Sequence, residues 1–172
     1  MANRKHLEIL QRSVSSAPAR LKSDEWIVWY ENTEWFLWRK AHPRIRPNLS
    51  GADLRGMMLV GIDFSFADLS GANLSGTSLS NLEGANLSYA DLSDADLVDT
   101  DLKKSNLSDA NLSRANLDFA ILHNANLSGA NLSDAHVTNA EVWGAILSGT
   151  NFSGADLEGS EFDDAIWPEE LG

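Results

Sequence analysis

The residue types that most often carry catalysis or metal binding are either sparse in this chain or part of a repeating pattern. The 172 residues include four His and no Cys, which excludes disulfides and thiolate metal sites. His6 and His42 precede the repetitive part, and His123 and His136 occupy different positions within it, so no metal-ligand spacing emerges. Ser and Asp are plentiful, but Ser, His and Asp come together by chance in so repetitive a sequence. We therefore expect no catalytic, cofactor or metal site.

The most regular feature of the sequence is a Leu or Phe at every fifth residue, with Ala or another small residue two positions earlier. Ala52-Asp53-Leu54-Arg55-Gly56 and Ala72-Asn73-Leu74-Ser75-Gly76 are examples. Seven centres run in one phase from Leu49 to Leu79, and 18 more run in a second phase from Leu82 to Trp167. A period of five fits neither a helix nor a flat strand, because both would scatter the Leu side chains over opposite faces.

A short extended piece followed by a bend in every unit does bury the Leu side chains. The Leu and the small residue then point inward, while the Asp or Asn between them and the two residues after Leu point outward. A chain that bends the same way every five residues winds into a coil, and stacked coils hydrogen-bond to one another. The period therefore predicts a solenoid.

The unit A-(D/N)-L-x-x resembles the motif of the pentapeptide repeat proteins, over about residues 47–167 and in 25 tandem copies. This resemblance implies an all-β solenoid, a right-handed quadrilateral parallel β-helix with four units in each coil. At ~4.8 Å between coils, six coils would make a rod about 30 Å long. The family is abundant in bacteria, especially cyanobacteria, and most of its members have no assigned activity.

The repeat changes phase once. The step from Leu79 to Leu82 is three residues, so two residues are missing from one unit. A phase change inside a straight segment would turn the Leu side chains outward, so it has to be absorbed at a corner. We predict a local bend or bulge at Ser80–Glu83. We interpret the two missing residues as a harmless deletion in preference to a binding feature.

The charge of the chain is unevenly distributed. Residues 1–46 hold nine basic and five acidic residues, whereas residues 47–172 hold four basic and 20 acidic ones, which gives net charges of +4 and −16. Residues 1–46 lack the repeat and are predicted to form an α-helical N-terminal cap. Residues 47–167 form the predicted β-helix, and residues 168–172 form a C-terminal tail.

Two helices are predicted in the N-terminal segment. The first runs from Asn3 to Val14. The second runs from Trp26 to Lys40 after an N-cap at Ser23, and a stripe on one of its faces includes Thr33, Phe36 and Leu37. Four Trp within 13 residues favour a cap that covers the open end of the solenoid, since large aromatic side chains can plug such an end. Trp35 and Trp38 fall outside the stripe, so they are the predicted contacts for a partner.

If residue n stacks on residue n+20, the outward side chains form columns. One column joins Asp94, Arg114 and Asp134, and we expect ion pairs along it. Another contains Glu83, Lys103, His123, Trp143 and Asp163, with a predicted pair between Glu83 and Lys103. Glu141 stacked on Glu161 is predicted to be mildly repulsive.

The densest acidic run supports two interpretations. It is either a solvated surface that keeps the rod soluble or an anionic face that binds a partner. Together with the aromatic residues, it completes the set of candidate partner-binding residues: Trp35, Trp38, Asp91, Asp94, Asp96, Asp99, Asp101 and Trp143.

Two functions remain open at this point. The first is a non-catalytic protein–protein interaction scaffold that presents rigid acidic faces. The second is mimicry of DNA, because some pentapeptide repeat proteins bind DNA gyrase in its place, and 16 net charges over about 30 Å approach the charge density of duplex DNA. The gyrase-binding members dimerise through a C-terminal helix, which this sequence lacks after Trp167. We also expect a monomeric, cytoplasmic protein with an unidentified protein partner, no direct binding to nucleic acid by the acidic rod, and no membrane segment.

Overall fold

Each five-residue unit folds as one bridging residue, one inward Leu or Phe, a two-residue turn and one inward small residue. The structure is a computed structural model that describes residues 2–15, 33–57 and 59–167. In a typical unit the carbonyl of Leu69 accepts a hydrogen bond of 3.0 Å from the N–H of Ala72, which closes the turn. The second turn residue has a positive φ, as at Gly71 (62°) and Asp94 (57°), an arrangement typical of type II turns. The turn explains why Gly, Asp and Asn recur at this position.

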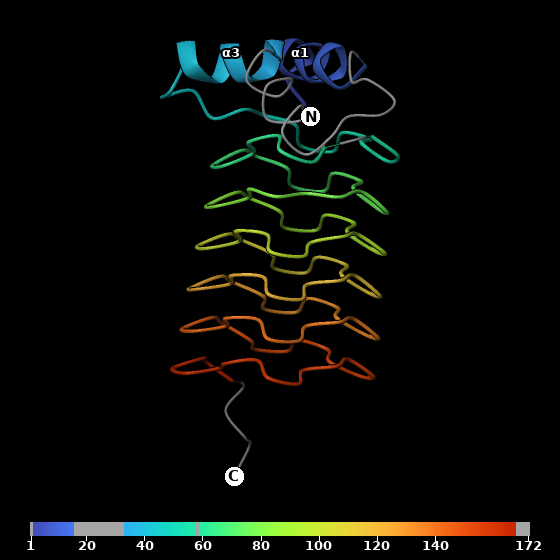
Figure 1. The fold of residues 1–172 in the computed structure, drawn as a ribbon, viewed down its shortest axis with the longest axis vertical. Helices are drawn as coiled ribbons and strands as arrows, with labels where there is room; N and C mark the ends of the chain where they lie inside the picture. The colour runs from blue at the N-terminus through green and yellow to red at the C-terminus, as the bar shows by residue number, and fades with distance from the viewer. Residues whose placement is uncertain (1, 16–32, 58, 168–172) are drawn as a thin grey trace.

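The turns stack in register and make the rod four-sided. Bridging residues pair in parallel with residues 20 further along the chain, or 18 further across the phase change. They form one column on each of four sides, which we number in chain order. Side 1 has Asn48, Asp68, Asn86, Asn106, Asn126, Ile146 and Ile166; side 2 has Asp53, Asn73, Asp91, Asn111, Asn131 and Asn151; side 3 has Ser78, Asp96, Asn116, His136 and Asp156; side 4 has Asp63, Asn81, Asp101, Ile121, Glu141 and Glu161. Figure 1 shows the resulting stack of flat coils.

The predicted four-sided stack is present, but its pairing is less extended than an all-β solenoid suggests. Among the described residues, each unit contributes one isolated bridge to the ladder and no continuous strand forms. The stacking still buries the Leu side chains completely, for example at Leu92 and Leu112. At about 1.5–3 kcal/mol for each buried Leu side chain, these columns are the main stabilising contribution of the rod.

The phase change removes a turn and leaves the columns intact. Leu79 is followed directly by Ser80 and the bridging residue Asn81, so the corner between sides 3 and 4 lacks the two-residue turn in this coil. Because two residues are lost, Asn81 still points outward and Leu82 still points inward. The carbonyl of Leu79 loses its usual partner and instead accepts a hydrogen bond of 2.8 Å from the buried hydroxyl of Thr100 in the next coil. The corner is therefore shortened rather than bulged.

Two helices cover the first coil (Figure 1). Helix α1 spans Arg4–Ser15, within one residue of the predicted bounds, and helix α3 spans Glu34–Ala41. The prediction of one continuous helix from Trp26 to Lys40 is wrong, because Thr33 is extended and caps α3 by accepting a hydrogen bond from the N–H of Phe36. The earlier part of the predicted helix, including Trp26 and Trp29, lies outside the described residues.

The cap supplies hydrogen-bond donors where a preceding coil would supply them. Inside the rod, the carbonyl of a bridging residue accepts a hydrogen bond from the preceding coil. The donor is the N–H of the buried Leu that follows the paired bridging residue, as Leu49 donates to Asp68. At the open end, the carbonyl of Asp63 accepts from Trp35 Nε1 at 2.9 Å. The carbonyl of Asn48 accepts from the N–H of Asn3 at 2.9 Å. The helices thus protect the edge of the first coil, which would otherwise expose unpaired carbonyls.

Arg39 connects the cap to the first coil at a third place. Its guanidinium donates to the carbonyl and hydroxyl of Ser65, both at 2.9 Å, and to the carboxylate of Asp63 at 3.2 Å. The same guanidinium donates to the carbonyl of Ile45. Ser65 is a first turn residue. Within the rod, the carbonyl of a first turn residue accepts from the second turn residue of the preceding coil, as Lys103 accepts from the N–H of Gly84. Arg39 therefore stands in for a turn of the missing coil.

Trp35 is the central contact of the cap. Its side chain is fully buried, and its ring centroid lies 5.6 Å from that of Phe64. Its backbone N–H donates to the hydroxyl of Ser13 in α1. The prediction that Trp35 is available to a partner is wrong. Leu37 is 53% exposed, which also contradicts its place on the predicted buried stripe. Both errors have one cause: α3 begins at Glu34, after the extended Thr33, so the predicted stripe does not continue from Trp26 into this helix.

At the far end of the rod, an aromatic cluster lies at the end of the described residues. Trp167 lies against Phe152 and Phe162, with ring centroids 6.0 and 5.4 Å away, and the last bridge is at Ile166. The predicted tail, 168–172, lies outside the described residues. Neither α1 nor α3, the helices of the described part of the chain, has the length and apolar character needed to cross a membrane.

We expect the cap to loosen as the pH falls through the imidazole range. His6 is buried, and its Nδ1 accepts a hydrogen bond of 2.9 Å from the N–H of Asn48, which only the neutral ring can do. Burial lowers the pKa of His6 below its ordinary value of 6.5, and Lys5 lowers it further. Between the two pKa values the unfolded chain binds more protons, so the free energy of unfolding should drop as pH falls through 6.5 and level off below the folded pKa.

Urea unfolding at pH 8.0 and at pH 5.5 tests this prediction. His6→Gln, which keeps an acceptor for Asn48, should reduce the difference between the two pH values. The matched variant His136→Gln, at an exposed position of side 3, should keep the full difference. A pH dependence equally large in His6→Gln would contradict the prediction.

Candidate partner-binding surfaces

Most polar side chains of the rod hold the backbone in place and are not free for chemistry. The bridging carboxylate or amide accepts from the N–H two residues later, as Asp91 accepts from Ser93 at 3.1 Å. Neighbouring bridging residues also bond to one another, as Asn126 donates to Asn106 and Asn106 donates to Asn86. Among the described residues, no group of three or more His, Asp or Glu could hold a metal ion.

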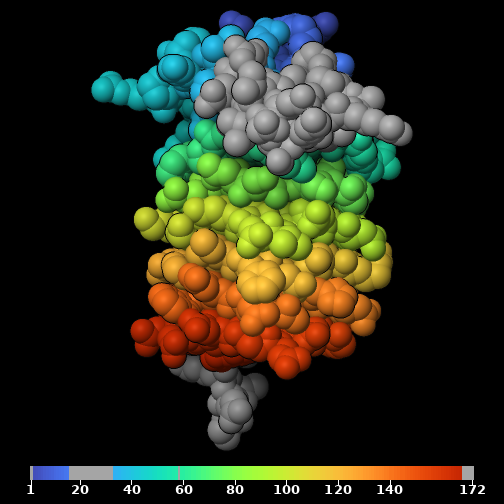
Figure 2. All heavy atoms as spheres, viewed as in Figure 1, coloured from blue at the N-terminus to red at the C-terminus, as the bar shows by residue number. Residues whose placement is uncertain are grey.

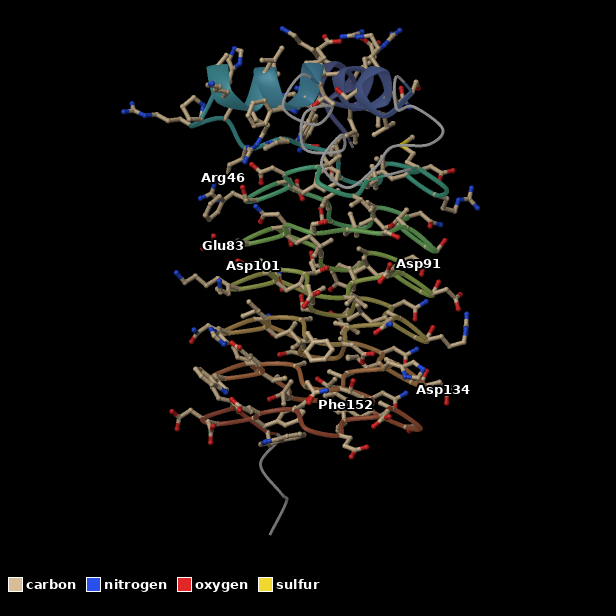
Figure 3. All side chains as sticks on the ribbon, in the orientation of Figure 1. Arg46, Glu83, Asp91, Asp101, Asp134 and Phe152 are labelled. Carbon is tan, nitrogen blue, oxygen red and sulfur yellow. The ribbon has the colours of Figure 1, made fainter. Side chains whose placement is uncertain are left out.

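The acidic run from Asp91 to Asp101 does not form one face. Asp91, Asp96 and Asp101 bridge on sides 2, 3 and 4, while Asp94 and Asp99 lie in the turns between those sides. Figure 3 labels Asp91 and Asp101 on opposite flanks of the rod. The run therefore wraps around a single coil, and the five carboxylates are not brought together.

Two of these five carboxylates, Asp94 and Asp101, pair with neighbouring cations. The predicted pair between Asp94 and Arg114 is confirmed, with two hydrogen bonds of 2.8 and 2.7 Å, and it lowers the pKa of Asp94. The bond to Asp94 raises the pKa of Arg114, and Asp134 adds a weaker, longer-range attraction. The predicted ion pair between Arg114 and Asp134 is therefore wrong. On side 2, Arg55 lowers the pKa of Asp53 to about 2.

The predicted pair between Glu83 and Lys103 is wrong. Lys103 Nζ instead lies 2.9 Å from the carboxylate of Asp101, two residues earlier in the same coil. A partner two residues away on the outward side can be reached with less loss of side-chain entropy than one in the next coil. The column rule alone did not take this nearer acceptor into account.

An aromatic platform projects from the turn between sides 4 and 1. The rings of His123 and Trp143 stack with centroids 4.7 Å apart and an interplanar angle of 4°. Trp143 Nε1 donates to the carboxylate of Glu161 at 3.0 Å, while Nε2 of His123 lies 2.6 Å from the carboxylate of Glu141. Trp143 remains 41% exposed. The platform thus combines an accessible indole with a fixed orientation.

Glu141 and Glu161 lie beneath the platform, and the mild repulsion expected between them stays a prediction. Glu141 and Glu161 do bridge in adjacent coils. Each carboxylate, however, turns to a different ring, Glu141 to His123 and Glu161 to Trp143. The carboxylate of Glu161 is thus held by an indole donor, while that of Glu141 lies against the imidazole of His123.

A second concave surface lies where the cap meets the rod. Two adjoining hollows of about 510 and 320 Å³ share Arg39, Pro43 and Phe66. We call them together the cap–rod groove. Besides the shared residues, the larger hollow is lined by Phe36, Lys40, Asp63 and Ser65, and the smaller one by Arg44, Ile45 and Arg46. Figure 2 shows the blue-green segment after α3 standing out from the side of the molecule above the first coils. Trp38, the other aromatic residue predicted to contact a partner, is only half-buried, stacking on His42 at 5.3 Å.

A family model of pentapeptide repeats matches residues 48–81, 78–103, 95–134 and 130–166, in eight copies. These matches cover more than half of the chain and the whole column of bridges on side 1. The chain belongs to the pentapeptide repeat family. Membership implies the right-handed quadrilateral β-helix, and the four columns of bridges agree with it.

Three solved structures illustrate the relationship. A pentapeptide repeat protein from the thylakoid lumen of Arabidopsis thaliana is 36% identical over 54% of this chain and 66% of its own, just under two thirds, with a TM-score of 0.53. Rfr23, a pentapeptide repeat protein from the cyanobacterium Cyanothece 51142, is 34% identical over 76% and 96% of the two chains, with a TM-score of 0.27. QnrB1, a plasmid-mediated fluoroquinolone resistance protein, is 22% identical over 71% and 78%, with a TM-score of 0.45. Among curated proteins, none matches the chain.

Pentapeptide repeat proteins are in general repeat scaffolds, and the two surfaces of this member differ in how visible they are in its sequence. The column that contains His123 and Trp143 follows from the repeat, although the stacking of the two rings does not. The cap–rod groove has no sequence signal of its own. It depends on how the segment after α3 returns to the first coil, which no local pattern encodes.

Proposed function

We propose that this protein is a non-catalytic scaffold that binds a protein partner along the turn between sides 4 and 1. The rod is rigid, because its backbone groups are paired between coils and its interior is filled by Leu side chains. Such a body binds with little loss of conformational entropy. Its contribution to a complex is then the fixed placement of a few side chains.

One observation carries the proposal, and it is the aromatic platform. Trp, Tyr and Arg dominate the energetic centres of protein interfaces, and a residue that is already oriented loses little freedom on binding. Trp143 meets both conditions, because it is exposed, stacked on His123 and held by Glu161. The surrounding carboxylates favour a partner surface with cationic groups around an apolar pocket.

Capture of partners by chemical crosslinking in the source cell tests this function. We expect Trp143→Ser to lose the principal crosslinked species by at least about tenfold, as loss of an interface centre of roughly 2 kcal/mol requires. Tyr89→Ser is the matched control, because Tyr89 is an exposed aromatic residue in the turn between sides 1 and 2. Equal loss in both variants, or in neither, would remove the platform from the interface.

The charge of the rod keeps mimicry of DNA as a second candidate. The net charge of −16 over about 30 Å is close to one charge per 1.7 Å of duplex. Mimicry depends on net charge alone, whereas the platform is a specific, oriented contact, so the scaffold is the better-supported proposal. A gyrase supercoiling assay separates the two candidates, since unchanged supercoiling at micromolar protein would eliminate mimicry. The cytoplasmic location and the monomeric state stay predictions.

A further inference from the structure

We propose that the cap–rod groove binds a short acidic peptide segment of a partner protein, at a site separate from the platform. The groove consists of two hollows with volumes of about 510 and 320 Å³, on a rod whose sides are otherwise built from stacked turns. Peptide segments bind in such grooves by placing one or two side chains in a hollow while flanking groups set the orientation.

The groove contains three cations that the described residues do not neutralise. Lys40, Arg44 and Arg46 have no carboxylate within ion-pair distance among the described residues. Six other basic residues of that part of the chain each have such a partner: Arg4, Arg12, Arg39, Arg55, Lys103 and Arg114. Of the five basic residues of that part of the chain without such a partner, three lie at the groove and two, Lys5 and Lys104, lie elsewhere. The three at the groove attract a ligand with carboxylates.

The floor of the groove is apolar and fixed. Phe66 is 45% exposed and has a φ of 57°, and its ring lies over Gly84, where an added Cβ would come within 2.6 Å of it. The glycine thus leaves the space in which this ring sits. Ser65 and Phe66 form one turn, and Arg39 holds that turn through its bonds to Ser65. An apolar side chain of a ligand would pack on a surface that needs no rearrangement.

The charge around the groove selects for a short ligand. Figure 3 places Arg46 above Glu83 and Asp101 on the same flank of the rod. A long polyanion such as a nucleic acid would continue from the cations onto these acidic coils and be repelled. A free phosphate ion would gain nothing from the ring of Phe66. A short segment with carboxylates around a Phe or Leu matches both the cations and the floor.

The groove and the platform lie on the same corner of the rod. The turn that carries Phe66 precedes the turn that carries Trp143 by four coils, which is about 19 Å at ~4.8 Å per coil. One partner can therefore occupy both sites, with its acidic segment in the groove and a cationic surface at the platform. Two linked contacts of this kind raise the total affinity through effective concentration.

Fluorescence anisotropy with a labelled peptide, Glu-Glu-Phe-Glu-Glu-Leu, tests the inference on the full chain. We expect saturable binding that weakens with salt and is absent for Gln-Gln-Phe-Gln-Gln-Leu. Arg44→Ser with Arg46→Ser should weaken binding at least about tenfold, and Phe66→Asn, which tolerates the positive φ, should weaken it several-fold. The matched variant Lys5→Ser with Lys104→Ser has the same net charge and should bind within twofold of wild type.

Several outcomes would overturn the inference. Equal loss in the two double variants would mean that only net charge matters, and equal competition by inorganic phosphate or by a DNA duplex would assign the cations to another ligand. Concentration-dependent self-association abolished by the Arg44 and Arg46 changes would mean that a second copy occupies the groove. Trp143→Ser should bind the peptide as wild type does, so failure of this inference is distinguishable from failure of the platform.

Discussion

Replacement of Trp35 by alanine is expected to lower the free energy of unfolding by about 3–5 kcal/mol, the range for removal of a buried aromatic side chain. The indole is fully buried against Phe64, and it donates the hydrogen bond that closes the edge of the first coil at Asp63. The variant loses the packing and also leaves the carbonyl of Asp63 without its donor. For a chain of this size the melting temperature should fall by roughly 10 °C.

Thermal and urea unfolding followed by circular dichroism measure this effect. Leu37→Ala is the matched control on the same helix, because Leu37 is exposed, and it should change the free energy of unfolding by less than about 0.5 kcal/mol. Similar melting of Trp35→Ala and wild type would show that the cap does not stabilise the rod. Partner capture by a Leu37→Ala protein should be unchanged.

The fate of Trp35 shows which part of the cap could be predicted. The sequence favours an aromatic cap over the first coil, and the structure has one. The predicted helical stripe begins at Trp26, however, whereas α3 begins at Glu34 after an extended Thr33. A shift of the helix start rotates every inference about its faces. The pair Thr33-Glu34 is itself an N-cap followed by an acidic first turn, so the signal was available but competed with an earlier one.

The rod is more predictable than the cap because its period is a constraint that every unit repeats. Stacking of residue n on residue n+20 places Asp94 beside Arg114 without any knowledge of side-chain geometry. The same rule fails for Lys103, because Asp101 competes for the ammonium group from within the same coil. Columns are therefore predicted by the repeat, whereas the choice between two acceptors depends on side-chain distances that the repeat does not encode.

The two candidate surfaces depend on departures from the repeat. In the turns between sides 4 and 1, the platform has His and Trp at the first turn residue, where other coils have Ser, Glu, Lys or Asp. The groove has Phe at the second turn residue, where the later coils have Gly, Lys, Asn or Asp. A solenoid turns most outward positions into equivalent solvent-facing ones. Specificity in such a molecule comes from the few units that break the pattern.

A deletion of Asp109 alone should be the most damaging change in the rod. The rod tolerates the native loss of two residues after Leu79 because the inward and outward positions keep their order. Loss of one residue reverses that order from Ala110 onward until a turn restores it. Several Leu side chains would then have to leave the core at about 1.5–3 kcal/mol each, so we expect the coils after the deletion to unfold.

The matched comparison is a deletion of both Ser108 and Asp109, which reproduces the native short corner. It should cost the turn hydrogen bond at Leu107 and the two backbone bonds of the lost turn to the neighbouring coils, from Tyr89 to Ser108 and from Asp109 to Ser128, together about 2–4 kcal/mol. Adding Ala110→Ser and Ala130→Thr supplies the groups that Ser80 and Thr100 supply beside Leu79, and it should recover about 1 kcal/mol. Limited proteolysis and urea unfolding distinguish the three proteins. If the one-residue deletion were as stable as the two-residue deletion, alternation of inward and outward side chains would not be what sets the register of the coils.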